Sequence, residues 1–218
     1  RGWTFAEHSF TTLIKPRIGV IEETRAKRIP MLPDAFDMKT EDLSFSNGKD
    51  DRPLVKRLYR ESFFRLFGLI EQLNYGGLKW RDDDGGNYIC EAIRLNLVPN
   101  LRHLNLNYNY LDEHFCRQLA DNLDESNIRL LSINLGFNPI GDTGLGILAK
   151  HLCLIKSVSV AGVDLTILGC YLLADHASNS STQLTNLDLG HNPIDNPYPL
   201  EVIVNGNPLE SIVKSVPS

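Results

Sequence analysis

Cysteine is scarce in this chain, and its spacing shows no pairing. Cys90, Cys116, Cys153 and Cys170 are the only four among 218 residues, and no two of them form a C-x-x-C motif. Each falls in an apolar stretch with helical periodicity, so buried reduced thiols are favoured over disulfides or a zinc site. We therefore expect an intracellular compartment, cytoplasmic or organellar.

Long apolar runs and an excess of one charge are also missing. No run reaches the roughly 18 residues of a membrane-spanning helix, and no signal-peptide pattern opens the sequence. The net charge of −5 is spread along the chain, which argues against a nucleic-acid surface. We therefore expect neither a membrane span nor a nucleic-acid partner. The chain begins with Arg1 rather than methionine, which favours a fragment or a processed form.

Catalytic and metal-binding signatures are absent as well. The six histidines lack H-x-x-x-H spacing, and the chain has neither a G-x-S-x-G elbow nor a glycine-rich phosphate loop. The run 82–86, DDDGG, invites a calcium interpretation. The EF-hand template would place Trp80 at its first ligand position, however, so a solvated helix cap is favoured. We expect no catalytic residue, no metal and no cofactor, and we predict that the chain is not an enzyme.

The sequence does have a repeated leucine pattern, clearest in LRHLNLNYNYL at 101–111. Leu104 and Leu106 are two residues apart, so both side chains of a short strand point inward. Asn109 follows, and its amide can bond backbone groups left unpaired where the strand ends. Such a unit cannot bury its own apolar face, so the pattern requires stacked neighbours.

Further copies of the pattern fill the C-terminal two thirds of the chain. LLSINLGFNPI starts at 130, LTNLDLGHNPI starts at 184, and a copy starting at 155 has Val163 in the asparagine position. A more divergent copy is assigned a start at Leu73, and a sixth, degenerate copy is assigned a start at Pro199. Most steps between starts are 25–29 residues, enough for a strand, a turn and a helix, which predicts a solenoid. Its helices are expected at 85–95, 115–123, 144–152 and 167–177.

The N-terminal quarter does not repeat. It predicts a short helix near residues 3–14, an extended segment at 18–21 and a helix starting near Pro33. The polar cluster 46–53 is interpreted as a domain boundary. An apolar stripe at helical spacing then predicts a helix that caps the first repeat. The predicted organisation is an N-terminal arm at 1–53, a capping helix at 54–72, a repeat array of about six units at 73–210 and a C-terminal tail at 211–218.

The segments LNLNYNYL, INLGFNPIGDTG and LDLGHNPI resemble the ribonuclease-inhibitor-like leucine-rich repeat family, over roughly residues 69–210. The resemblance implies an α/β solenoid: a right-handed horseshoe with parallel strands on its concave face and helices on its convex face. The segments RGWTFAEHSFTTLIK and FSNGKDDRPLVKRLY resemble the region ahead of the repeats in uncharacterised leucine-rich repeat proteins of unicellular algae. That second resemblance supplies a context and no function.

The eighth position of the successive copies is rich in aromatic residues. Neighbouring strands lie about 4.8 Å apart, so rings at one repeat position would form a column on the concave edge. Exposed aromatic rows are the usual anchors of protein interfaces; alternatively, the rings pack on each other or on the asparagine turns. Polar, almost uncharged residues surround the column. The predicted partner-binding residues are Trp80, Tyr108, Phe137, His191, Tyr75, His103, Asn105 and Asn134.

These patterns favour a protein-interaction or scaffold module that binds a protein partner through the concave face. One alternative is an architectural subunit embedded in a large multiprotein assembly, with residues 1–53 as a docking arm. Another is a non-catalytic fragment of a larger multidomain enzyme. Fold and function are separable, so the repeats alone do not choose among these interpretations.

Overall fold

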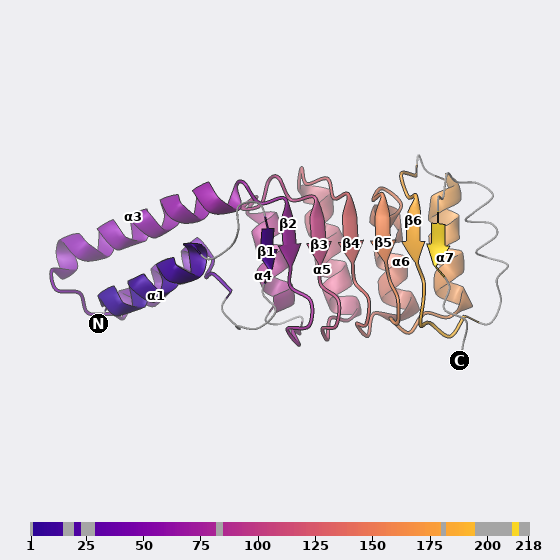
Figure 1. Cartoon of the computed structure of the whole chain (residues 1–218), viewed down its shortest axis with the longest axis horizontal. Coiled ribbons are helices and arrows are strands. Elements are labelled where there is room, and N and C mark those ends of the chain that lie inside the picture. Colours follow the sequence, from indigo (N-terminus) through magenta and orange to yellow (C-terminus); the bar gives the residue numbers. More distant parts are fainter. Residues whose placement is uncertain are drawn as a thin grey trace.

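The computed structural model describes residues 2–14, 20–22, 29–81, 85–179, 182–194 and 211–213. They form a mixed α/β structure built on one parallel sheet (Figure 1). Five strands form the middle of the sheet, and two edge strands extend it to seven, all in chain order. The strands are β1 Val20–Glu22, β2 Gln72–Asn74, β3 His103–Asn105, β4 Ser132–Asn134, β5 Ser157–Ser159, β6 Asn186–Asp188 and β7 Ser211–Val213.

The central residue of each middle strand points into the core. Leu73, Leu104, Ile133, Val158 and Leu187 pair with one another in register across β2 to β6, and all are at most 2% exposed. The two flanking residues of each strand are half-buried and face the other side, as the alternation of strand side chains requires. The predicted inward orientation of Leu104 is confirmed.

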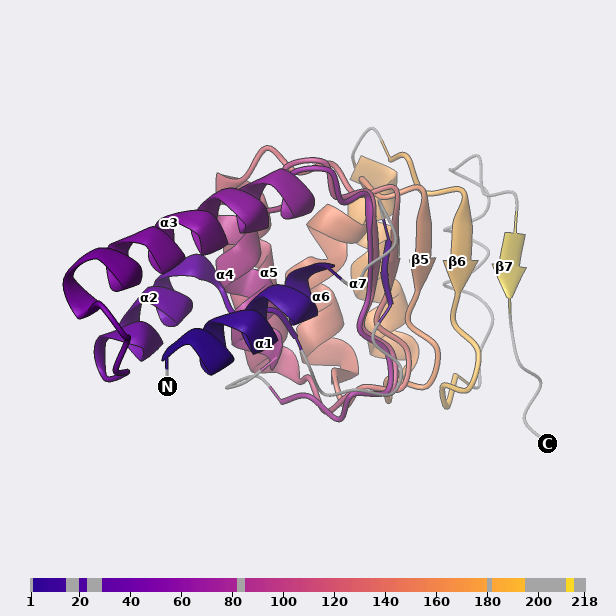
Figure 2. The same cartoon turned by 60° about the vertical axis from the view of Figure 1, so that its left-hand side comes forward.

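Helices connect the middle strands, as parallel strands require. They are α4 Asn87–Arg94, α5 Glu113–Glu125, α6 Gly141–Leu152 and α7 Ile167–Asn179. All four lie on one side of the sheet (Figures 1 and 2), and each packs against the next in the row. Their positions confirm the four helices expected from the sequence. We call the opposite side of the sheet, where the flanking strand residues lie, the strand face.

One aspartate links two successive helices. The Asp142 carboxylate accepts the backbone N–H groups of Thr166 and Gly169, each at 2.9 Å. The other carboxylate oxygen accepts the Thr166 hydroxyl. These N–H groups belong to the start of α7, where the first turn has no helical acceptors. Asp142 therefore caps the helix of the following repeat.

The N-terminal residues form a helical unit at one end of the sheet (Figure 1). It consists of α1 Gly2–Ile14, α2 Pro33–Glu41 and α3 Gly48–Phe67. Its core is aromatic: the rings of Phe36 and Tyr59 stack at 3.7 Å, and those of Phe63 and Phe67 at 4.0 Å. The helix predicted as the cap, now α3, packs mainly on α1 and α2. It is β1 that pairs with the edge of β2.

Two predicted boundaries differ from the structure. The helix predicted at 54–72 instead begins at Gly48, inside the polar cluster 46–53. Asn47 accepts the N–H groups of Asp50 and Asp51 through its carbonyl, and the Asp51 carboxylate accepts the Asn47 N–H at 2.8 Å. This reciprocal bonding starts the helix inside the polar segment. The sheet also extends past the predicted 73–210 array at both ends, since β1 and β7 join it.

All four cysteines are buried and free, as predicted. Burial raises the pKa of the Cys153 and Cys170 thiols to about 11, so neither is a reactive thiolate at neutral pH. Among the helices that the structure describes, none combines the length and the apolar character needed to cross a membrane.

Candidate functional site

The loop that follows each middle strand is fixed by an asparagine ladder. The Asn109 amide donates to the carbonyls of Leu106 in its own copy and Tyr75 in the preceding one, at 2.8 and 2.9 Å. Its side-chain oxygen accepts the Trp80 N–H at 3.0 Å. The asparagine thus bonds unpaired backbone groups, as predicted, and also joins adjacent repeats.

The same pattern recurs along the sheet, with one gap. Asn138 donates to Leu106 and Leu135 and accepts the Leu111 N–H. Asn192 makes the equivalent bonds to the copy that starts at 155. Val163 occupies the asparagine position of that copy and is fully buried. Its side chain cannot form hydrogen bonds, so the ladder is interrupted between β4 and β5.

The ladder corrects the register of the first copy. Leu73 pairs with Leu104, so it is the fourth residue of its copy, whereas the sequence interpretation made it the first. Tyr75 and Trp80 consequently take the places of Leu106 and Leu111. They are 0% and 7% exposed, and their rings contact each other at 4.8 Å. Both were predicted on the partner-binding surface, and both lie in the core instead.

The sixth predicted copy, starting at Pro199, lies outside the described residues. The structure pairs Ile212 of β7 with Leu187 of β6. The strand that follows β6 in the sheet is therefore at 211–213, about ten residues later than the position predicted from Val202.

The eighth position has a left-handed backbone in each of the five copies that contain β2 to β6. Its φ is +53° at Tyr108, +57° at Phe137 and +57° at His191, and glycines occupy it in the other two copies, at Gly77 and Gly162. A residue with a β-carbon costs roughly 1–2 kcal/mol in this conformation, whereas glycine is almost indifferent to it. Glycine would therefore satisfy the backbone at all five positions, yet three carry large rings.

These three rings form a contiguous row. Tyr108 and Phe137 stack in parallel with centroids 4.2 Å apart, and the rings of Phe137 and His191 lie 5.5 Å apart. Gly162 makes room between the last two, since a β-carbon there would lie 2.8 Å from the Phe137 ring. Tyr108 remains 55% exposed. We call Tyr108, Phe137 and His191 the ring row; the predicted column is confirmed for these three residues.

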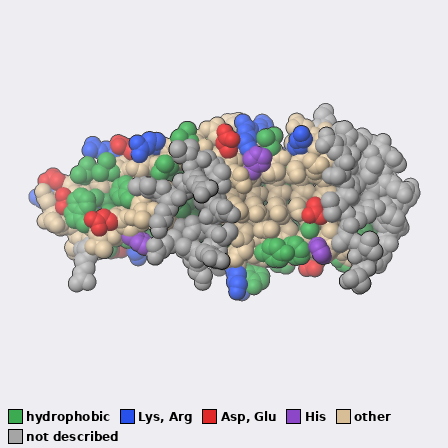
Figure 3. Space-filling model, viewed as in Figure 1, with side chains coloured by type: hydrophobic (Ala, Val, Ile, Leu, Met, Phe, Trp, Pro, Cys, Tyr) green, Lys and Arg blue, Asp and Glu red, His purple; other side chains and the backbone are tan. Residues whose placement is uncertain are grey.

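Beside the ring row, the strand face is polar and carries little charge. His103 and Ser132 are joined by a hydrogen bond of 2.8 Å between Nδ1 and the hydroxyl. Asn105 donates to Asn74 at 2.9 Å, and Asn134 accepts the Gly136 N–H at 3.0 Å. His103, Asn105, Ser132 and Asn134 help to line a hollow of about 260 Å³. Figure 3 shows this face as mostly uncharged, with a hydrophobic patch and a histidine near its lower edge.

The arrangement places hydrogen-bonding side chains beside stacked aromatic rings. Within the described ranges, no group of three or more histidine, cysteine, aspartate or glutamate side chains is placed to hold a metal ion. The structure brings together six of the eight predicted residues and places Tyr75 and Trp80 elsewhere. No protein-family model matches the chain, and no curated protein matches it.

Proposed function

We propose that the chain is a leucine-rich repeat solenoid of the ribonuclease-inhibitor-like type that acts as a protein-interaction module. In this proposal the strand face is the concave face of a right-handed horseshoe with its helices on the convex side. Support for this fold comes from the in-register apolar residues of β2 to β6, the asparagine ladder and the single layer of helices. The partner is a protein, bound along the ring row and the adjoining polar strand residues.

The observation that carries the proposal is the left-handed backbone beneath the ring row. Three rings are retained at positions where glycine would remove a strain of roughly 1–2 kcal/mol each. Stacking recovers about 0.5–1.5 kcal/mol for a well-placed pair. That gain roughly offsets the strain at one residue, so stability alone gives little reason for three rings. Exposed rings held in fixed register are, however, well suited to a protein interface, because little entropy is lost on binding.

The backbone strain allows binding to be separated from folding. Tyr108→Gly and Phe137→Gly each remove a ring and relieve strain, so the urea midpoint should stay within experimental error of the wild type or rise slightly. Partner recovery should nevertheless fall by about five-fold or more for each variant. The measurement is quantitative mass spectrometry of proteins retained by the tagged full chain, with the urea midpoint of each variant recorded in parallel.

Two control variants locate the contact. Tyr110→Ala changes a ring that is 52% exposed and lies outside the ring row. Arg117→Ala changes an exposed side chain of α5, on the helix side of the sheet. Both should retain the partner. A partner that is lost in Arg117→Ala and retained in both glycine variants would place the contact on the helices and refute the proposal.

A second candidate, an architectural subunit docked through its N-terminal unit, is favoured by a separate observation. Several large apolar side chains are exposed there, including Trp3 at 40%, Leu58 at 41% and Phe64 at 45%. Exposed apolar groups that cluster on one unit often mark a contact. Loss of the partner in Leu58→Ser with retention in Phe137→Gly would favour this candidate.

A further inference from the structure

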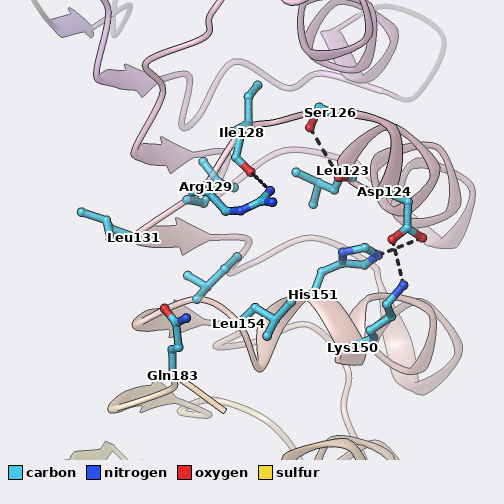
Figure 4. Close-up of a pocket in the computed structure, with 12 residues that line it drawn as sticks. Leu123, Asp124, Ser126, Ile128, Arg129, Leu131, Lys150, His151, Leu154 and Gln183 are labelled. Carbon is cyan, nitrogen blue, oxygen red and sulfur yellow. Dashed lines mark hydrogen bonds and ion pairs between the residues drawn. The ribbon is translucent and has the colours of Figure 1, made fainter. Parts of the chain in front are cut away.

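A short connection leads from α6 to β5, at the edge of the sheet where the strands begin. Only residues 153–156 separate α6 from β5, whereas 126–131 separate α5 from β4 and 180–185 separate α7 from β6. A pocket of about 390 Å³ lies there, lined by residues from all three connections and from the ends of α5 and α6 (Figure 4). This volume is within the range of small-molecule sites.

The floor and walls of the pocket are apolar. Ile128 and Ile155 are each 4% exposed and form part of the core, whereas Leu131 and Leu154 are each 45% exposed. Leu123 completes the apolar lining. Leucine side chains this exposed at the mouth of a cavity contribute little hydrophobic free energy unless a ligand covers them.

The polar lining of the pocket carries a positive charge in a chain whose net charge is −5. Lys150 is paired with Asp124 at 2.8 Å, and Asp124 lies 3.7 Å from His151. These are the titratable groups that face the pocket besides Arg129. Since Asp124 neutralises Lys150, the net positive charge comes from Arg129.

The Arg129 guanidinium is held at the pocket and retains unused donors. Its Nη1 donates to the Ile128 carbonyl at 3.0 Å, its only hydrogen-bond partner among the described residues. The Arg129 carbonyl is in turn held by the Arg102 guanidinium at 2.9 Å. Figure 4 shows Arg129 on the opposite side of the pocket from the Asp124–Lys150–His151 cluster. A guanidinium with free N–H groups is well suited to binding a carboxylate.

We propose that this pocket binds a small amphiphile with an apolar chain and one carboxylate, such as a medium-chain carboxylic acid. The chain lies on Leu123, Leu131 and Leu154, and the carboxylate accepts hydrogen bonds from Arg129. This site is on a different edge from the ring row, so it is independent of the proposed protein contact.

The test uses octanoate and octylammonium as probes, followed by amide chemical shifts of the full chain in solution. Octanoate should shift the amide signals of Ile128, Leu154 and Gln183, and should bind about ten-fold more tightly than octylammonium. Arg129→Gln should lower the affinity for octanoate about ten-fold and leave the affinity for octylammonium unchanged. Arg129→Lys should retain most of the octanoate affinity. Leu154→Gln should lower the affinity for both probes.

Arg117→Gln is the matched control, because it removes an exposed cation from α5 outside the pocket. It should not change the affinity for either probe. Equal affinities for the two probes would show that Arg129 does not select an anion and would overturn the proposal. The same conclusion would follow if octanoate produced no shifts at the pocket amides, or if its affinity were unchanged in Arg129→Gln.

Discussion

Replacing Asn138 with alanine should strongly destabilise the chain, because its amide is buried and bonds backbone groups in two adjacent repeats. The side chain is 1% exposed. It donates to the carbonyls of Leu106 and Leu135 at 2.9 and 2.8 Å and accepts the Leu111 N–H at 3.1 Å. Alanine would leave all three groups buried without this partner, and a buried unsatisfied polar group costs about 1–3 kcal/mol. Even at the lower limit, the loss is about 3 kcal/mol.

Equilibrium unfolding in urea, followed by circular dichroism, measures this loss. Asn134→Ala is the matched control: it removes the same side chain from the same repeat, but Asn134 is only half-buried and accepts one hydrogen bond from the described residues, the Gly136 N–H. It should cost less than about 1 kcal/mol. If Asn138→Ala cost no more than Asn134→Ala, the ladder would not contribute to stability and the reasoning would be refuted.

Two further predictions concern the pH dependence of stability and the N-terminal end. Burial lowers the pKa of His151 below its ordinary value of 6.5, although Asp124 partly opposes this shift. The unfolded chain therefore binds a proton more readily than the folded chain does. As a result, the free energy of unfolding should fall as pH drops below 6.5. His151→Gln should weaken that dependence in urea titrations at several pH values, and an unchanged profile would contradict the assignment. Removing residues 1–68 takes away β1 and exposes the edge of β2, so the shortened chain should aggregate on size-exclusion chromatography; a soluble monomer would show that the N-terminal unit protects nothing.

The sequence predicted the middle of the sheet well, because its copies keep leucine and asparagine at fixed positions. Leu104, Ile133 and Leu187 lie in register as the pattern required. The first copy was placed three residues out of register, because Tyr75 and Trp80 replace the expected leucines. A template that admitted aromatic residues at these core positions would have found it.

The candidate site was only partly predictable. Repeat spacing placed Tyr108, Phe137 and His191 in one column, which the ring contacts confirm. The left-handed backbone under them depends on the turn that the asparagines hold, and the sequence pattern does not state backbone angles. The pocket near Arg129 was also not predicted from the sequence. The shortened step between the copies at 130 and 155 was its only signal, and step length alone does not show that a pocket forms there.

The gap in the asparagine ladder affects which hydrogen bonds must break when part of the chain unfolds. Each strand contacts only its neighbours in the sheet, so local cooperativity depends on the bonds between adjacent repeats. Asn109 and Asn138 join β2, β3 and β4 into one tightly coupled block, whereas Val163 provides no such bond across β4 and β5. Asp142 instead joins the two sides of this gap through its bonds to Thr166 and Gly169, so separating β5 from β4 requires breaking these carboxylate bonds, whereas opening the first block requires breaking the asparagine bonds.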